Sequence, residues 1–128
     1  MILILFSPWK TVATALSQVK SRTLASNDGT FPPTSFVDKN PSGIIVGGDV
    51  IALRNGIHSK ITVQNFYNEI PITITGDQGH TPIVHEFSLA SSANWIIKCL
   101  NFTSPNPNPG LNIVSIGSGF QGKRFYFL

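Results

Sequence analysis

Cysteine and charged residues are both scarce in this chain. A single cysteine, Cys99, occurs among 128 residues, and charged residues make up only 12% of the sequence. One thiol excludes an internal disulfide framework, and the apolar neighbours of Cys99 predict a small buried side chain rather than a catalytic or metal-bound thiolate. Disordered chains have few apolar residues and a high net charge, so the low charge argues against intrinsic disorder. It also argues against a helical bundle, whose outer faces carry charges.

Long apolar runs and long basic runs are also missing. The apolar start at residues 1–6 is too short to span a bilayer, and it lacks the basic region and the cleavage site of a signal peptide. We expect an inward-facing strand there, or the remnant of a longer gene. The net charge is +3 and no basic run exceeds two residues, which favours solvated surface charges over a phosphate-binding stripe. The sequence therefore predicts no nucleic-acid partner and no membrane partner.

The chain contains one good helical pattern, which covers residues 7–19. Ser7 can cap a helix N-terminus through its hydroxyl, and Pro8 fits the first helical position, where no backbone donor is needed. Apolar residues then recur at helical spacing and form one stripe: Trp9, Val12, Ala13, Leu16 and Val19. We therefore expect an amphipathic helix that packs against the rest of the domain.

Residues 20–47 lose this periodicity. Turn-forming residues cluster at 26–29 (SNDG), 32–33 (PP) and 40–43 (NPSG). We expect a long loop insertion here, with a short strand at 44–46. A loop of this length in a compact domain is usually functional or mobile.

A series of short apolar runs begins after Gly48. The first run lies in the stretch 48–56, and similar runs, each bounded by Gly, Asn, Pro or Ser, follow at residues 70–75, 82–87, 95–102 and 111–116. Ile51, Ile72, Ile96 and Val114 take equivalent places in these runs, about 20 residues apart, which is the spacing of a repeat architecture. No helical pattern separates the runs, so a doubly wound α/β sheet is excluded.

Two all-β architectures fit this series, an antiparallel sandwich and a solenoid whose coils stack on one another. One run alternates cleanly, with Ile70, Ile72 and Ile74 on one face and Thr73 and Thr75 on the other. That alternation suits either architecture. The helical pattern favours the solenoid, because the open end of a solenoid must be capped and one helix before the first coil does this.

The order of the motifs resembles a known family. The motifs are residues 7–12 (SPWKTV) with the helical pattern, 48–56 (GDVIALRNG), 71–76 (PITITG) and 94–102 (NWIIKCLNF). This succession resembles the N-terminal start of right-handed parallel β-helix proteins of the pectin-lyase-like superfamily, and most closely their chondroitinase-B and alginate-lyase-like subset. The resemblance spans roughly residues 7–19 and 48–116. His58 departs from it, because relatives commonly carry Tyr at this place.

The resemblance implies one all-β domain over residues 1–128. It is a right-handed parallel β-helix (solenoid) of a few coils, with a capping α-helix at 7–19, a loop insertion at 20–47 and coils over 48–128. Relatives are much longer, and the catalytic Lys, Arg and metal-binding carboxylates of the lyases lie on their later coils. We therefore expect a truncated N-terminal portion, to which no catalytic residue, cofactor or metal ligand can be transferred. Ca²⁺ would belong to full-length relatives.

The resemblance also implies a function. Its lyase relatives lead us to expect a portion of a secreted or cell-surface carbohydrate-active protein, polysaccharide-lyase-like, that binds or acts on acidic polysaccharide. Whether the whole protein is an enzyme stays open, and the isolated chain is expected to lack lyase activity. The alternatives are a structural β-helix, as in a phage tail spike or a surface adhesin, and a β-sandwich binding module. The apolar end at residues 123–128 would leave strand edges unpaired on the last coil and invite self-association.

Few residues offer the chemistry of a lyase, which needs a base of suitable pKa and a cation to neutralise a uronate carboxylate. His80, His85 and Glu86 are close in sequence, but His85 and Glu86 would point to opposite faces of one strand. We expect solvated side chains there rather than a metal site. Asp49 and Asp77 are predicted to be turn residues rather than ligands.

Sugar contacts and structural ladders are the remaining candidates. Aromatic rings on an outer face can stack on sugar rings, which makes Tyr67, Phe66 and Trp95 the candidate carbohydrate contacts. Asn94 and Asn101 are predicted to stack in side-chain ladders between coils. Such ladders would be structural rather than catalytic.

Overall fold

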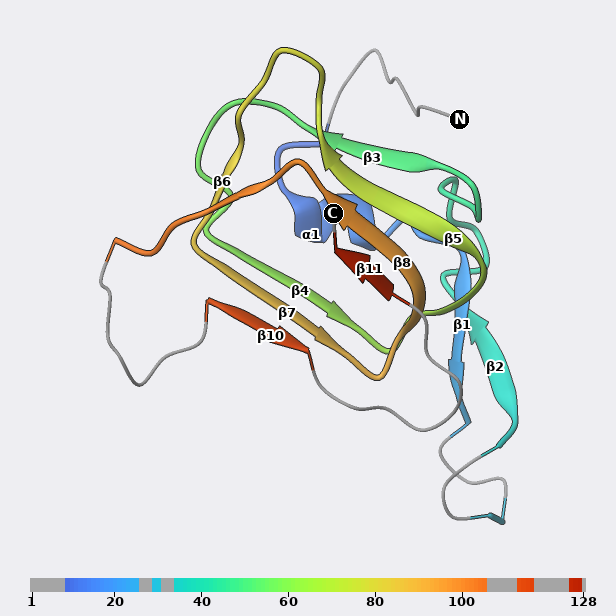
Figure 1. Cartoon of the computed structure of the whole chain (residues 1–128). Coiled ribbons are helices and arrows are strands. Elements are labelled where there is room, and N and C mark those ends of the chain that lie inside the picture. The colour runs from blue at the N-terminus through green and yellow to red at the C-terminus, as the bar shows by residue number, and fades with distance from the viewer. Residues whose placement is uncertain (1–8, 26–28, 31–33, 106–112, 117–124, 128) are drawn as a thin grey trace.

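Strands make up most of the described chain, and one short helix accompanies them (Figure 1). The computed structural model describes residues 9–25, 29–30, 34–105, 113–116 and 125–127. Only the backbone is described for residues 125–127. The elements, in chain order, are α1 (Val12–Leu16), β1 (Ser21–Leu24), β2 (Phe36–Lys39), β3 (Val50–Leu53), β4 (Lys60–Gln64), β5 (Tyr67–Gly76), β6 (Ile83–Val84), β7 (Glu86–Ala90), β8 (Ala93–Lys98), β9 (Asn101–Phe102), β10 (Val114–Ile116) and β11 (Phe125–Phe127). The predicted all-β class is confirmed.

Apart from the β1–β2 hairpin, the described strands pair in parallel and form three sheets. The first sheet has the order β11-β8-β5-β3, the second β10-β7-β4 and the third β6-β9. Ile57 extends the third sheet through a parallel bridge to Ile83. Parallel neighbours exclude the antiparallel sandwich that the sequence left open.

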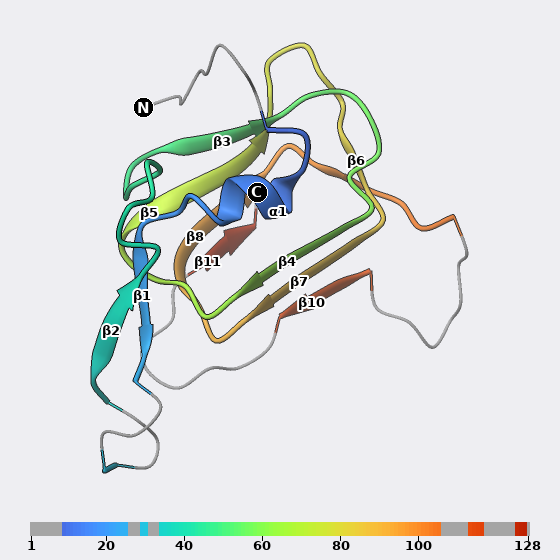
Figure 2. The same ribbon diagram turned by 180° about the vertical axis from the view of Figure 1, so that it is seen from behind.

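The chain visits the three sheets in a fixed order and then returns to the first. It passes from β3 through Ile57 to β4, then from β5 through β6 to β7, and then from β8 through β9 to β10. Each such passage is called a circuit below. Residues paired on adjacent circuits are 23 apart at Val50 and Thr73 and 26 apart at Ile61 and Phe87, and Figures 1 and 2 show these strands side by side.

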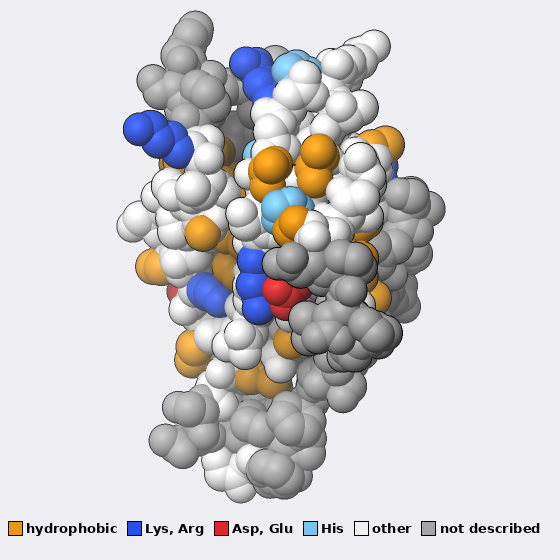
Figure 3. Space-filling model, turned by 90° about the vertical axis from the view of Figure 1, so that its left-hand side faces the viewer, with side chains coloured by type: hydrophobic (Ala, Val, Ile, Leu, Met, Phe, Trp, Pro, Cys, Tyr) orange, Lys and Arg blue, Asp and Glu red, His pale blue; other side chains and the backbone are white. Residues whose placement is uncertain are grey.

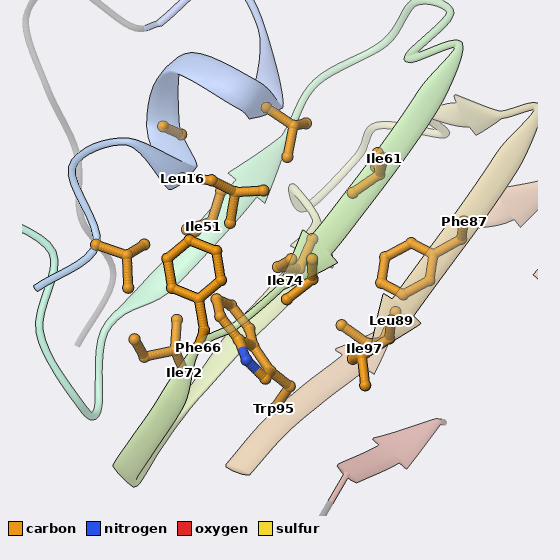
Figure 4. Close-up of a cluster of buried hydrophobic side chains, with 14 of the residues drawn as sticks. Leu16, Ile51, Ile61, Phe66, Ile72, Ile74, Phe87, Leu89, Trp95 and Ile97 are labelled. Carbon is orange, nitrogen blue, oxygen red and sulfur yellow. The ribbon is translucent and has the colours of Figure 1, made fainter. Parts of the chain in front are cut away.

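The hydrophobic core fills the space between the sheets (Figure 4). Ile51, Ile74 and Ile97 are paired in register across β3, β5 and β8, and all three are buried. In the second sheet, Ile61 and Phe87 form another buried register pair. Full burial of one such side chain contributes about 1.5–3 kcal/mol, so these recurring inward positions hold adjacent circuits together.

The predicted register is wrong for the four residues that were given equivalent places, namely Ile51, Ile72, Ile96 and Val114. Ile51 pairs with Ile74, and Val114 pairs with Phe87 in another sheet. Ile96 keeps part of its surface exposed, because Trp95 and Ile97 on either side of it take the inward positions of β8. A shift of one residue turns a side chain to the other face of a strand, and the spacing of repeats does not resolve a single residue.

The alternation predicted for five residues of β5 is confirmed for four of them. Ile72 and Ile74 are buried, whereas Thr73 and Thr75 keep part of their surface. Ile70 is 59% exposed. It lies where the register between β5 and β8 shifts, so it does not share the inward face of the two buried isoleucines.

The helix begins later than predicted and is shorter. The Thr11 hydroxyl oxygen accepts a hydrogen bond from the Thr14 N–H at 3.1 Å and caps α1. The structure therefore has a helix of five residues in place of the predicted span 7–19. Ser7 and Pro8, the predicted cap and first helical residue, lie outside the described residues.

The buried stripe of α1 also differs from the predicted one. Val12, Ala15 and Leu16 are buried, whereas Ala13 is exposed. Val19 lies beyond the helix and forms a parallel bridge with Ile45. Figure 2 shows α1 in front of the space that the sheets surround. Within the described part of the chain, no helix has the length and apolar character that a membrane span requires.

Residues 20–47 contain an antiparallel hairpin, not the predicted loop. β1 and β2 pair from Ser21 with Lys39 to Leu24 with Phe36. The short strand expected at 44–46 is reduced to one bridging residue, Ile45. The sequence did not indicate the hairpin, because β1 has no alternation of buried and exposed positions: all four of its residues are half-buried.

Polar contacts tie the hairpin to the circuits. The Lys39 Nζ donates to the carbonyl oxygens of Gln64 and Asn65, both at 2.9 Å, and lies 3.7 Å from the centre of the Phe66 ring. Partial burial lowers the pKa of Lys39. The Arg22 Nε donates to the Tyr67 carbonyl oxygen at 3.1 Å. The hairpin is thus fixed by charged groups that bind backbone oxygens.

A ladder of asparagine side chains connects β5 to β8. The Asn94 Nδ2 donates to the Asn68 carbonyl oxygen at 2.7 Å, and the Asn68 Nδ2 donates to the Asn94 carbonyl oxygen at 3.2 Å. The Ser21 hydroxyl donates to the Asn68 Oδ1 at 2.7 Å, which joins the hairpin to the ladder. The prediction for Asn94 and Asn101 holds only in that Asn94 joins two circuits: its amide binds a backbone oxygen of Asn68, whereas Asn101 is exposed.

Candidate functional site

The three aromatic residues predicted to contact sugar lie inside the core. Phe66, Tyr67 and Trp95 expose 6%, 2% and 0% of their surface. The rings of Phe66 and Trp95 pack edge to face with centres 5.7 Å apart, and burial raises the pKa of Tyr67. These rings offer no open face to a ligand, so the prediction is wrong for all three. Aromatic rings bury a large apolar area, which favours the inward positions that the strands provide.

The histidine and carboxylate residues that the sequence singled out do not form a metal site. Among the described residues, no group of three or more His, Cys, Asp or Glu side chains could hold a metal ion. Glu86 pairs with Lys60 at 3.1 Å, and the Asp77 Oδ1 accepts from the next backbone N–H. Asp49 is buried and accepts from the Val46 N–H at 2.8 Å. The prediction that Asp49 and Asp77 are turn residues is confirmed.

Cys99 is exposed, contrary to the prediction of a buried thiol. It directly follows β8, and its φ of 56° lies in the left-handed region, as in a turn. Trp95 and Ile97 take the inward positions of β8. The apolar neighbours of Cys99 in sequence are therefore not its surroundings in space.

A pocket of about 300 Å³ opens between α1 and β3. It borders β3, the end strand of the first sheet, so it lies at the end of the sheets that α1 occupies. Residues from two separate segments line this α1–β3 pocket, the segment that leads into α1 and the segment from β3 to the following turn. The sequence places these segments some 40 residues apart, at Trp9 and at Val50.

The inner wall of the α1–β3 pocket is apolar. Val12 and Ala15 contribute from α1, and Ile51 and Leu53 contribute from β3. Trp9 adds an indole that is only half-buried and packs against the core. The pocket therefore offers an apolar surface and one broad aromatic ring that a ligand can reach.

The rim of the pocket carries positive charge. Lys10 and Arg54 are exposed, and His58 is half-buried. No described carboxylate lines the pocket. The Arg54 Nε lies 3.5 Å from the Asp77 Oδ2, and this partly exposed pair offsets part of the charge of Arg54. The rim therefore favours a ligand with negative charge.

Hydrogen bonds to the next circuit hold the rim in place. The Thr81 N–H donates to the Asn55 Oδ1 at 2.6 Å, and the Asn55 N–H donates to the His80 Nδ1 at 3.1 Å. Within the same turn, the His58 Nε2 donates to the Arg54 carbonyl oxygen at 2.9 Å. These contacts order the turn before a ligand arrives, which reduces the entropy lost on binding.

The side of the molecule that carries β6 in Figure 1 mixes cationic, histidine and hydrophobic side chains (Figure 3). Several hydrophobic groups gather near the histidine side chains, and blue groups lie above and below them. Red groups are few on this face, and the largest one touches a blue group. This view agrees with the excess of Lys and Arg over Asp and Glu in the sequence.

Sequence reasoning missed the α1–β3 pocket. Trp9 was assigned to the buried face of a helix, and Arg54 was counted among the dispersed surface charges. A signal did exist, because Trp9 is followed directly by Lys10 and Arg54 directly follows an apolar strand. Only the tertiary structure brings these side chains to one opening.

No family model, curated protein or solved structure matches this chain. The resemblance to the pectin-lyase-like superfamily therefore remains a prediction. The function must be inferred from the α1–β3 pocket and from the parallel sheets beside it.

Proposed function

We propose that residues 48–128 form the first coils of a right-handed parallel β-helix, and that α1 caps its N-terminal end. The regular return of the chain to each sheet supports this, with paired residues 23 and 26 apart. The right hand follows from the strong preference of parallel crossover connections. The cap is supported by the burial of Val12 and Leu16, because the first coil of a solenoid needs a cover for its apolar end.

We further propose that this portion belongs to a secreted or cell-surface, polysaccharide-lyase-like protein and binds acidic polysaccharide. The observation that carries this is the α1–β3 pocket, where Trp9 lies beside Lys10, Arg54 and His58. An indole covers the C–H face of a sugar ring, and the cations pair with its carboxylate. The parallel sheets act as the rigid support that keeps the pocket open.

In this proposal the described coils bind polysaccharide without cleaving it. Proton abstraction next to a uronate carboxylate needs a tuned base and a neutralising cation in one geometry. The resemblance assigns that chemistry, and any Ca²⁺, to later coils of longer relatives. The chain thus supplies affinity and position rather than a reaction.

Affinity electrophoresis tests the proposal. We expect gels containing polygalacturonate or alginate to retard the chain, and gels with carboxyl-reduced polymers to leave it unretarded. The double substitution Lys10→Gln with Arg54→Gln should weaken the retardation, whereas Lys20→Gln, an exposed lysine outside the pocket, should not. Equal retardation by the neutral polymers would contradict the proposal. Formation of unsaturated uronate products would contradict the non-cleaving role.

A structural β-helix of a spike or adhesin is the second candidate. The observation that favours it is Ile116, which is 47% exposed in β10, the end strand of the second sheet. An exposed apolar residue on the end strand of a sheet can associate with another copy. Sedimentation equilibrium distinguishes the candidates, because a stable trimer that binds no acidic polysaccharide would favour the structural role.

A further inference from the structure

We infer that Asn101 is an acceptor for an N-linked oligosaccharide when the chain enters a secretory compartment. The segment Asn101-Phe102-Thr103 matches the acceptor pattern Asn-x-Ser/Thr, in which the middle residue is not proline. One other asparagine, Asn40, stands two residues before a serine or threonine, but Pro41 follows it and breaks the pattern. The chain therefore offers one acceptor. The inference rests on the secreted location that the proposed function includes, and it does not depend on what the α1–β3 pocket binds.

The short strand β9 turns both polar side chains of this pattern outward. The Asn101 N–H donates to the Pro82 carbonyl oxygen at 3.1 Å. The Thr103 N–H donates to the Val84 carbonyl oxygen, also at 3.1 Å, so the backbone is held against β6. Phe102, between the two polar residues, packs against the core, whereas Asn101 and Thr103 are exposed. Because side chains alternate along a strand, a sugar on Asn101 leaves the core undisturbed.

The side-chain amide of Asn101 is available for attachment. Within the described part of the chain it takes part in no hydrogen bond. Other asparagines use their amides to hold the fold: Asn68 and Asn94 bind backbone oxygens of adjacent circuits, and Asn40 binds the Val19 carbonyl oxygen. Attachment of a sugar takes a proton from the amide nitrogen. Asn101 therefore gives up no structural hydrogen bond when it is modified.

The modification is a group transfer from a lipid diphosphate oligosaccharide. The Asn101 Nδ2 forms a bond to the first sugar carbon, and the bond from that carbon to the phosphate oxygen breaks. The lipid diphosphate leaves with the bonding electrons, and the amide nitrogen loses one proton. The acceptor pattern requires a hydroxyl group two residues after the asparagine. Thr103 supplies it, and in an extended chain it lies on the same face as Asn101.

An exposed apolar pair lies beside Asn101 on the third sheet. Ile83 is paired with Asn101 on one side and is bridged to Ile57 on the other. Ile57 is 62% exposed, and Ile83 is half-buried. Neighbouring strands lie about 4.8 Å apart, so the first sugars of a glycan at Asn101 reach across this row. Their C–H faces cover the two isoleucine side chains, which hides apolar surface from water.

Translation of the full chain behind a cleavable secretory leader, with endoplasmic-reticulum microsomes, tests the inference. Protection from added protease identifies the translocated chain. We expect this chain to carry one glycan, which peptide N-glycosidase removes. Thr103→Ser should keep the glycan because the hydroxyl group remains, whereas Thr103→Ala and Asn101→Gln should lose it. A translocated chain without a glycan, or a glycan that persists in Asn101→Gln, would overturn the inference.

Thermal unfolding provides a second readout, which checks the outward placement of Asn101. The chain is purified from a eukaryotic secretory host grown with or without an inhibitor of oligosaccharide donor synthesis. The glycosylated form should unfold about 2–5 °C higher, because the sugars cover Ile57 and Ile83. With Ile57→Thr, at an exposed position, this difference should fall by at least half. Equal unfolding temperatures would overturn the covering of the apolar pair, and a lower one for the glycosylated form would overturn the outward placement.

The outcomes separate the inference from the proposed function. A translocated chain without a glycan that polygalacturonate gels still retard would overturn the inference and leave polysaccharide binding intact. A glycan at Asn101, together with an Asn101→Gln variant that these gels do not retard, would support the inference and contradict polysaccharide binding. The variant is used in the gels because it keeps the pocket residues and has no acceptor.

Discussion

The parallel circuits and the segment that precedes them are held in different ways. Between circuits, apolar side chains recur in register and are buried, as Ile74 and Ile97 are. In the β1–β2 hairpin, individual polar contacts reach the circuits, such as those of the Lys39 Nζ with the Gln64 and Asn65 carbonyl oxygens. Repeated burial distributes stability over many residues, whereas the hairpin depends on a few side chains of specific length and charge.

The largest expected effect lies within the circuits. Ile74→Ala should lower the free energy of unfolding by about 2–5 kcal/mol, because a fully buried side chain is lost and a cavity remains. Ile70→Ala, in the same strand but 59% exposed, is the matched control and should change it by less than about 0.5 kcal/mol. Urea unfolding curves measure both. Equal effects would contradict the register of β5.

A smaller effect is expected where the two regions meet. Asn68→Ala removes the acceptor of the Ser21 hydroxyl and the donor to the Asn94 carbonyl oxygen. Unsatisfied buried polar groups cost about 1–3 kcal/mol each, so we expect a loss in that range by urea unfolding. Asn101→Ala, at an exposed asparagine, should stay within about 0.5 kcal/mol. A neutral Asn68→Ala would show that the ladder adds no stability.

The Lys39 contact should make stability depend on pH. Burial places its folded pKa below the ordinary 10.5, so between these two values the unfolded chain binds more protons than the folded one. Stability attributable to Lys39 should therefore rise as the pH increases through that window, and it should be constant below it. The measurement compares unfolding of the unmodified chain with Lys39→Met from neutral pH to pH 10.5. Lys20→Met is the exposed control, and a falling difference would contradict the burial of Lys39.

The smallest effects belong to the exposed ion pairs. Arg22 lies 3.1 Å from Glu69, and Lys60 lies 3.1 Å from Glu86. Glu69→Gln breaks a pair between the hairpin and β5, and Glu86→Gln breaks one between circuits. Both should cost about 0–1 kcal/mol, since solvent screens exposed pairs. Thermal unfolding at low and high salt checks this, and a larger loss for Glu69→Gln would mean that the hairpin depends on this pair.

The fold was predictable where burial repeats along the chain. The clean alternation of Ile72, Thr73 and Ile74 marks an inward face, and the absence of helical patterns between runs fits a chain of strands. The exact partners were not predictable, because a pairing such as Ile51 with Ile74 depends on the length of each turn between the sheets. Spacing of about 20 residues leaves several registers open.

The candidate site was less accessible to sequence reasoning. An aromatic residue in a strand can face either a ligand or the core, and the sequence does not show which. The structure shows that Phe66, Tyr67 and Trp95 face the core. Trp9 and Arg54 are separated by most of the N-terminal segment, and neither belongs to a motif that predicts contact with the other. Their shared opening forms where the segment around α1 and the segment around β3 come together.

The sequence by itself determined an all-β chain with turn residues such as Asp49, because local periodicity and local hydrogen bonding express these features directly. The tertiary structure decided which residues pair between circuits, that the hairpin replaces a loop, and that Trp9 meets Lys10 and Arg54 at one pocket. The pairing of circuits and the pocket arise from contacts between segments far apart in sequence, and the hairpin is held in part by its contacts with the circuits. Their free energy depends on how whole elements pack, which no single stretch of sequence encodes.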